Sequence, residues 1–275
     1  MGKSATLFYE KCARLIDFFA LCVYNKHRNA KGKFMSLREM IYKRKSVRKY
    51  TAQKVDSSTL FQIQQFIDKA KPLYPRLKTR IELVERSKIK SPFPWTPPHA
   101  IVAYGELKDG AYENAGFILQ QIELYLETLG LGVCWLGMGK PDVCVAEAKD
   151  GGLKYLIMLG FGYPDEPLFR EASQFKRKTL EEIADRTDER LEAARLAPSS
   201  VNSQPWYFTH DGDCLRAYCR TKGLLNRILG NMNRIDMGIA LAHLYVEHGE
   251  GFHFAFEENV RELSGYRYSG SVRIE

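Results

Sequence analysis

The apolar positions of the chain fall into runs with the spacing of amphipathic helices. Between residues 58 and 71, apolar side chains recur at intervals of three and four, which predicts a helix that ends before a proline. A shorter helix is expected over residues 36–42, where Ser36 and Glu39 have the spacing of a capping box. Three further helices are predicted over 118–129, 188–196 and 234–245, the first two ending near Gly130 and Pro198.

Other segments have the patterns of strands. Residues 79–84 alternate between apolar and polar, as a half-buried strand does. Residues 100–104 and 156–161 are almost continuously apolar, which is typical of a buried strand. Two more strands are expected at 206–209 and 252–256. With 275 residues, the chain is long enough to bury a substantial core in one large domain or two small ones.

The first 34 residues form an arm with a different pattern. Its apolar positions between residues 4 and 25 are interrupted by charges, so no run approaches the ~20 residues that span a bilayer. Asp17 also splits the apolar core that a signal peptide would need. We expect an amphipathic helix followed by a solvated linker. We favour packing on the body or on a second chain; binding to an anionic membrane surface is the alternative.

Composition narrows the partners. The net charge of +8 admits anionic ligands, but the basic residues are scattered, with local peaks at 43–49 and 176–178. We therefore expect local phosphate binding and no nucleic-acid partner. The six cysteines form no C-x-x-C pair, so we expect reduced thiols in a cytoplasmic protein and no metal site.

Residues 197–206 form a polar elbow between a predicted helix and a predicted strand. Two hydroxyls, two side-chain amides and several backbone N–H groups are available there to a flat polar ring. An ordinary Ser/Asn-rich turn is the alternative. The cationic run 43–50 contains one serine, a combination that suits a phosphate, although a solvated basic patch has the same composition. His243 and His248 are five residues apart and lack the spacing of a zinc-binding pair.

Several of these segments resemble motifs of the FMN-dependent nitroreductase family. The elbow from Pro198 to Trp206 resembles the Pro-Ser-Ser-x-Asn-x-Gln-Pro-Trp motif that borders the flavin ring. The run 44–50 resembles the family's Arg-x-Ser-x-Arg-x-aromatic entry motif. Residues 130–138, 160–164 and 176–183 are similar to its Gly-Leu-Gly strand, its Gly-Tyr-Pro turn and its basic segment before a Leu-Glu-Glu helix. The resemblance implies an α+β fold, a three-layer sandwich of mainly antiparallel sheets flanked by helices.

The resemblance also implies which residues contact FMN. The phosphate and ribityl chain would meet the entry motif and the later basic segment, with Arg177 pointing away. The ring would meet the Gly-Leu-Gly strand end, the Gly-Tyr-Pro turn and the elbow. The implied cofactor-binding residues are Arg44, Lys45, Ser46, Arg48, Leu136, Gly137, Met138, Gly160, Gly162, Lys176, Lys178, Pro198, Ser199, Ser200 and Asn202.

The sequence also indicates two related halves, residues 35–185 and 186–275. The helix at 234–241 parallels 111–118, and the elbow follows the counterpart of the helix at 58–71. Only the first half has the cationic entry motif, and only the second has the Pro-Ser-Ser elbow. This resembles a branch of the family in which one chain mimics the usual dimer. A monomer of this kind and a homodimer both remain open.

The resemblance implies an oxidoreductase that passes reducing equivalents from NAD(P)H through FMN to a small acceptor such as a nitroaromatic or a quinone. The flavin carries the chemistry, so no catalytic acid or base is expected. A flavin-binding redox sensor or carrier without turnover is the alternative.

Overall fold

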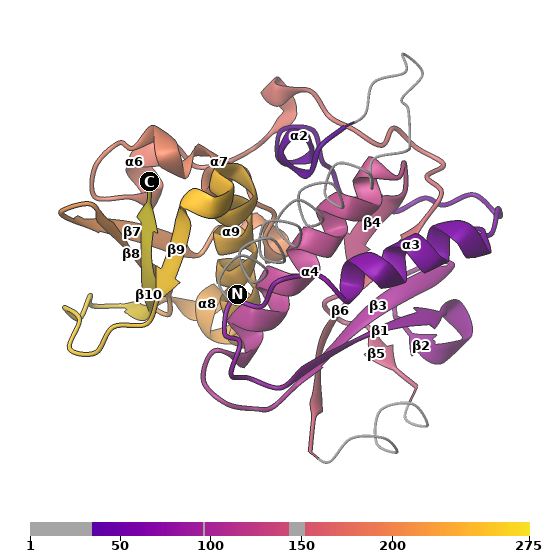
Figure 1. The fold of residues 1–275 in the computed structure, drawn as a ribbon, viewed down its shortest axis with the longest axis horizontal. Coiled ribbons are helices and arrows are strands. Elements are labelled where there is room, and N and C mark those ends of the chain that lie inside the picture. Colours follow the sequence, from indigo (N-terminus) through magenta and orange to yellow (C-terminus); the bar gives the residue numbers. More distant parts are fainter. Residues whose placement is uncertain (1–34, 96, 143–151) are drawn as a thin grey trace, which may run out of the picture.

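The computed structural model describes residues 35–95, 97–142 and 152–275 (Figure 1). It has three layers, with two long helices between two four-stranded sheets. Every pair of neighbouring strands in these sheets is antiparallel, so the α+β sandwich expected from the sequence is confirmed. The first sheet has the order β1 (Thr79–Glu85), β3 (His99–Gly105), β6 (Lys154–Gly162), β4 (Gly132–Trp135), and the second has the order β7 (Trp206–Asp211), β8 (Cys214–Arg220), β10 (Tyr266–Ile274), β9 (Phe252–Ala255).

The central layer is formed by α4 (Ala111–Thr128) and α9 (Asn231–His248). Both begin before the ranges that the apolar pattern predicts. In α4 the reason is that its first turns bury polar side chains in hydrogen bonds and an ion pair. Asn114 accepts from the backbone of Tyr74, and Glu113 pairs with Arg234. A buried polar residue interrupts an apolar pattern, so this pattern identified only the later turns of α4.

Short helices connect these layers. The capping box at the start of α2 (Leu37–Ile41) is confirmed, because Ser36 Oγ accepts from Glu39 N and the Glu39 carboxylate accepts from Ser36 N. The helix expected at 58–71 is α3 (Ser57–Ile67), capped by Asp56. The remaining helices are α6 (Leu180–Ile183), α7 (Glu192–Leu196) and α8 (Leu224–Leu229), and the 3-10 turns are η1 (Arg86–Lys88), η2 (Ala172–Gln174), η3 (Glu189–Leu191), η4 (Ser200–Asn202) and η5 (Gly249–Gly251).

The two sheets have the same topology. In each, two strands precede the long helix, two follow it, and the last strand lies between the second and third. The long helices cross at a pair of glycines: Gly116 lies against the backbone carbonyl of Ile235, and Gly238 lies against that of Glu113. A Cβ on either glycine would clash with that carbonyl, so both must be glycine for the helices to approach this closely. The contact aligns Gly238 with Gly116, whereas the expected alignment of 234–241 with 111–118 places Gly238 opposite Ala115.

Several elements were not predicted. Strand β8 buries Leu215, Ala217 and Cys219 at alternate positions, with Tyr218 buried between them, and the sequence analysis missed it together with β10. A small sheet of β2 (Ile89–Lys90) and β5 (Lys140–Pro141) lies outside the first sheet. Two-residue strands carry no pattern that a sequence could reveal.

The expectations for the N-terminal arm concern residues 1–34, which lie outside the described residues. Within the described residues, none of the helices is long and apolar enough to cross a membrane. The three cysteines described there, Cys134, Cys214 and Cys219, are free thiols, and two of them are buried.

Candidate cofactor site

The cationic entry segment lies at the open edge of the first sheet. It leaves α2 and runs beside β4, where Val47 N donates to Val133 O at 2.9 Å. A second segment lies on its other side, because Arg170 N donates to Lys43 O at 2.9 Å. Residues 44–48 are therefore held between β4 and residues 169–170, two parts of the chain that are far away in sequence.

Arg44 is buried, with 1 % of its side chain exposed. Its Nε and Nη2 lie 3.1 and 2.8 Å from Glu123 Oε1, and Nη2 also donates to Ser46 Oγ at 3.3 Å. Burial alone would lower the pKa of Arg44, but Glu123 and Glu127 raise it. Burial raises the pKa of Glu127 well above its usual range, despite the charge of Arg44. The guanidinium is thus neutralised mainly by the carboxylate of Glu123 on α4.

The neighbouring cations differ in their surroundings. Lys45 Nζ forms an ion pair with Glu166 at 3.0 Å, and the same carboxylate accepts from the backbone N–H of Arg48 at 2.6 Å. The side chain of Arg48 is exposed. Glu166 therefore fixes the backbone of the entry segment and neutralises Lys45, while Arg48 stays available to a ligand.

Beside the entry segment, two half-buried arginines form no ion pair with any described residue. Arg170 and Arg177 both lie over the ring of Phe175, with their guanidinium carbons 4.9 and 5.8 Å from its centre. No carboxylate of a described residue is within ion-pair distance of either, and Arg170 Nε is buried with no hydrogen-bond partner. Burial and the charge of Arg44 lower the pKa of Arg170, although Glu127 and Glu123 partly oppose this. Burial, Arg44 and Arg170 lower the pKa of Arg177 to about 10. Such a cluster is stabilised by an anion.

The basic segment 176–178 joins this cluster to the polar elbow. Arg177 Nη1 donates to Asn202 Oδ1 at 2.7 Å, and its Nε donates to Ala197 O at 2.9 Å. Lys178 Nζ is directed at the elbow as well, donating to Gln204 O at 2.8 Å, while Lys176 is exposed. The expectation that Arg177 points away is therefore wrong. Sequence spacing alone could not reveal it, because the chain is not a regular strand there.

The elbow has an unusual backbone. Val201, Asn202 and Gln204 adopt left-handed conformations, with φ of 47°, 56° and 46°. A β-branched residue such as valine rarely has this conformation, and such strain of ~1–3 kcal/mol per residue concentrates at functional sites. Ser199 Oγ stabilises the turn by accepting from Gln204 N at 2.9 Å. As predicted, the elbow lies between a helix, α7, and a strand, β7.

A buried carboxyl supports the elbow from below. Asp236 on α9 is 3 % exposed, and its two oxygens accept from Ser200 N at 3.1 and 3.0 Å. Burial raises the pKa of Asp236 to about 8, although the hydrogen bond from Ser200 N opposes this. The sequence analysis missed this residue. An aspartate on the apolar face of the helix predicted at 234–245 was the signal that could have identified it.

The residues that follow β4 lie close to the elbow, because both contact the first turns of α9. Leu136 is buried, Met138 is exposed, and a Cβ on Gly137 would lie 2.7 Å from the terminal carbon of Met232. Met232 is one turn before Asp236 on α9. The structure thus brings together the entry segment, residues 136–138, the basic segment and the elbow, which come from both halves of the chain.

Two of the predicted residues have another structural reason to be glycine. On β6, a Cβ on Gly160 would clash with the ring of Pro97, and one on Gly162 would lie 2.5 Å from Pro98. The proline-rich segment therefore fills the space that these glycines leave. Their contact with a cofactor stays a prediction.

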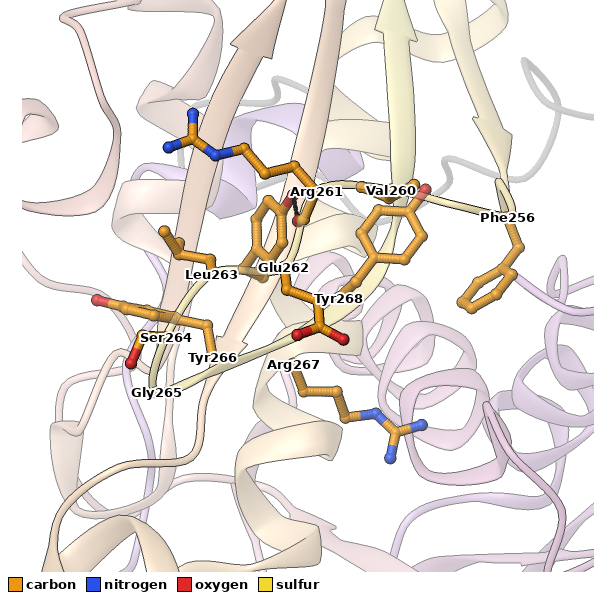
Figure 2. Close-up of a pocket in the computed structure, with 11 residues that line it drawn as sticks. Phe256, Val260, Arg261, Glu262, Leu263, Ser264, Gly265, Tyr266, Arg267 and Tyr268 are labelled. Atoms are coloured by element: carbon orange, nitrogen blue, oxygen red, sulfur yellow. Dashed lines mark hydrogen bonds between the residues drawn. The ribbon is translucent and has the colours of Figure 1, made fainter.

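A cavity of about 760 Å³ opens elsewhere, beside residues 256–268 (Figure 2). Its lining includes the aromatic residues Tyr218, Tyr266 and Tyr268, and none of the predicted cofactor residues contributes to it. In Figure 2 the guanidinium groups of Arg261 and Arg267 point to opposite sides, so they do not converge on one ligand. Nor does any cluster of His, Cys, Asp or Glu in the described ranges have the arrangement of a metal site.

Both histidines of α9 have structural roles. His243 is buried and its Nδ1 lies 2.9 Å from Ala193 O, and His248 Nε2 lies 3.0 Å from Arg190 O. Burial lowers the pKa of His243 to about 3, so it is neutral at physiological pH. They help to hold the turns before and within α7 against α9.

Comparison with known proteins gives a consistent result. Residues 36–248 match the family described as "Putative TM nitroreductase", which is most of the chain. No curated protein matches. Among solved structures, a "putative nitroreductase" from Thermotoga maritima is 21 % identical, with a TM-score of 0.60, over 90 % of this chain and 96 % of that chain. At this identity the likeness shows the fold.

Other structures match over a smaller part of the chain. A nitroreductase family protein from Clostridium difficile is 21 % identical with a TM-score of 0.44, covering 54 % of this chain and 96 % of that chain. An FMN-dependent nitroreductase from Clostridium difficile is 18 % identical with a TM-score of 0.39, covering 52 % of this chain and 95 % of that chain.

Proposed function

The chain belongs to the "Putative TM nitroreductase" family, and from this premise we propose that it is an FMN-dependent oxidoreductase. It would pass reducing equivalents from NAD(P)H to small acceptors such as nitroaromatics or quinones. Membership of a nitroreductase family supports oxidoreductase chemistry in general. The single observation that carries the proposal of FMN is the half-buried pair of Arg170 and Arg177 beside a strained polar elbow, neither of which forms an ion pair with a described residue.

The cation cluster fits a phosphate. A phosphate would supply a direct ion-pair partner for Arg170 and Arg177 and an acceptor for the buried Nε of Arg170. Arg48 is exposed next to them and completes the cationic side of the proposed site. Arg44 and Lys45 already pair with Glu123 and Glu166, so we assign them mainly to holding the entry segment in place.

The elbow and the end of β4 fit the edge of a flat ring. Ser199, Ser200 and Asn202 place polar groups on a backbone that is fixed by Asp236 and Arg177. On the other side, Gly137 follows β4 and presents backbone with no side chain, next to Met232 of α9. When bound, FMN would supply the hydride-transfer chemistry. The residues of this chain would bind its phosphate, orient its ring and exclude water, and none is assigned as a proton donor or acceptor.

Steady-state oxidation of NADH and NADPH tests the proposal. We expect the FMN-loaded protein to oxidise at least one of them only when a quinone or nitroaromatic is present, with ping-pong kinetics. A protein that holds FMN but shows no turnover with either donor would favour the redox-carrier alternative. A protein that never retains FMN would refute the flavoenzyme assignment.

A further inference from the structure

The two sheets and long helices are related by an approximate twofold axis through the contact of α4 and α9. Each glycine of that contact lies against the carbonyl of the residue three positions before the other, Ile235 for Gly116 and Glu113 for Gly238. The offset along the helices is 238 − 116 = 122 residues. Since both sheets also have the same strand order, each element around the proposed flavin site has a counterpart in the other half.

The counterpart of the polar elbow is the segment 72–76, which follows α3 as the elbow follows α7. Both are held by equivalent side chains. Ser200 N donates to Asp236, two residues before Gly238, and Tyr74 N donates to Asn114 Oδ1 at 2.9 Å, two residues before Gly116. The two loops therefore occupy equivalent places against the two long helices.

At the second place, the side chain of Tyr74 packs between the start of α4 and strand β9. Its ring lies against Gly110 at the start of α4, where a Cβ would be 3.0 Å from ring carbons. It makes an edge-on contact with Phe254 of β9 at 5.3 Å between ring centres, and its hydroxyl donates to Ser269 O at 2.9 Å. The loop, the helix start and strand β9 are the counterparts of the elbow, the start of α9 and strand β4.

The charges at the second place are also different. Asp109 accepts from both Arg234 and Arg267, and Glu113 pairs with Arg234 at 2.8 Å. Both arginines thus form direct ion pairs with carboxylates, whereas Arg170 and Arg177 form none with the described residues. The second place therefore holds the ring of Tyr74, and its arginines Arg234 and Arg267 already have carboxylate partners.

We propose that the chain carries a single flavin site. Its symmetry-related counterpart is filled by the side chain of Tyr74, which stabilises the fold. This inference rests on the proposed function. A homodimeric nitroreductase of the kind that the sequence resembles would use both equivalent places; this chain would use one.

Saturation with FMN gives the first test. We expect one FMN per chain from absorbance after desalting. Two per chain would overturn the inference and leave the proposed function intact, whereas no binding would overturn both.

Matched variants at the symmetry-related positions give the second test. Asp236→Ala and Asn114→Ala each remove the partner of one partly buried backbone N–H, so both should lower the melting temperature. Only Asp236→Ala should weaken FMN binding, by about fivefold or more. Equal weakening in both variants, or none in Asp236→Ala, would contradict the assignment of one elbow to the flavin.

Tyr74→Ala keeps the inference testable where Asn114→Ala folds poorly. We expect the apo variant to melt at a lower temperature, while saturating FMN stabilises it by the same increment as wild type, since that increment depends only on ligand concentration and affinity. Tyr74→Phe, which keeps the ring, should lose much less stability. Loss of the FMN increment in Tyr74→Ala would place Tyr74 in the flavin site and overturn the inference.

Discussion

Arg177 donates from Nη1 to Asn202 Oδ1 at 2.7 Å. This hydrogen bond joins the basic segment of the first half to the polar elbow of the second. Asn202 in turn donates from Nδ2 to Lys176 O at 2.9 Å, so the two segments are linked in both directions. The binding of a ligand to either segment therefore depends on the position of the other segment.

Replacing this arginine should affect phosphate binding selectively. Arg177→Gln should weaken FMN binding by about 1.5–3 kcal/mol, the range for a hydrogen bond to a charged group. Riboflavin, which lacks the phosphate, should lose much less. Titration of both flavins measures the difference. Arg38→Gln is the control, since Arg38 is an exposed arginine that pairs with Glu247. Equal losses for FMN and riboflavin would exclude Arg177 from the phosphate site.

The buried pair of Arg44 and Glu123 should show strong coupling. Arg44→Ala leaves Glu123 buried without its cation and should cost about 3–5 kcal/mol of unfolding free energy. Removing both partners should cost less than the sum of the single changes, because no unpaired charge remains. Chemical denaturation of the two single variants and the double variant measures this. Additive losses would show that the pair is not coupled.

The buried carboxyl under the elbow should make stability depend on pH. The pKa of Asp236 is raised to about 8 in the folded chain, above the ~3.9 of an unfolded aspartate. The folded state then binds the extra proton between these values, so the contribution of Asp236 to stability is present at low pH and lost as pH rises through about 8.

Asp236→Asn should remove this dependence while keeping an acceptor for Ser200 N. We expect the free energy of unfolding of the variant, relative to wild type, to rise between pH 6 and 9. His243 is present in both proteins, so its protonation cancels from this difference even near the ordinary pKa of histidine, ~6.5. A difference that stays constant with pH would mean that Asp236 does not titrate there.

The helix crossing should not tolerate a methyl group. Gly→Ala within a helix ordinarily stabilises by about 0.5–1 kcal/mol. Gly116→Ala and Gly238→Ala should instead destabilise, by ~1–3 kcal/mol or more, because the new Cβ meets a backbone carbonyl that cannot move without its helix. Thermal melts of both variants test this. An increase in melting temperature for either one would contradict the close packing.

The local parts of the fold could be predicted from the sequence. The capping box of Ser36 and Glu39 and the elbow after α7 depend on residues that are neighbours in the chain. The ion pairs of the site could not be predicted, because Arg44 and Glu123 are 79 residues apart in the sequence and only the fold brings them together. Arg170 was missed for the same reason, since it reaches the cluster through the packing of its segment against Lys43.

The absorbance spectrum of the purified chain, recorded after incubation with FMN and desalting, tests the central claim most directly. If Arg170 and Arg177 form a phosphate site beside the elbow, the protein should stay yellow and release FMN on denaturation, and Arg177→Gln should lose the colour on desalting. A wild-type protein that is colourless after the same treatment would contradict the account.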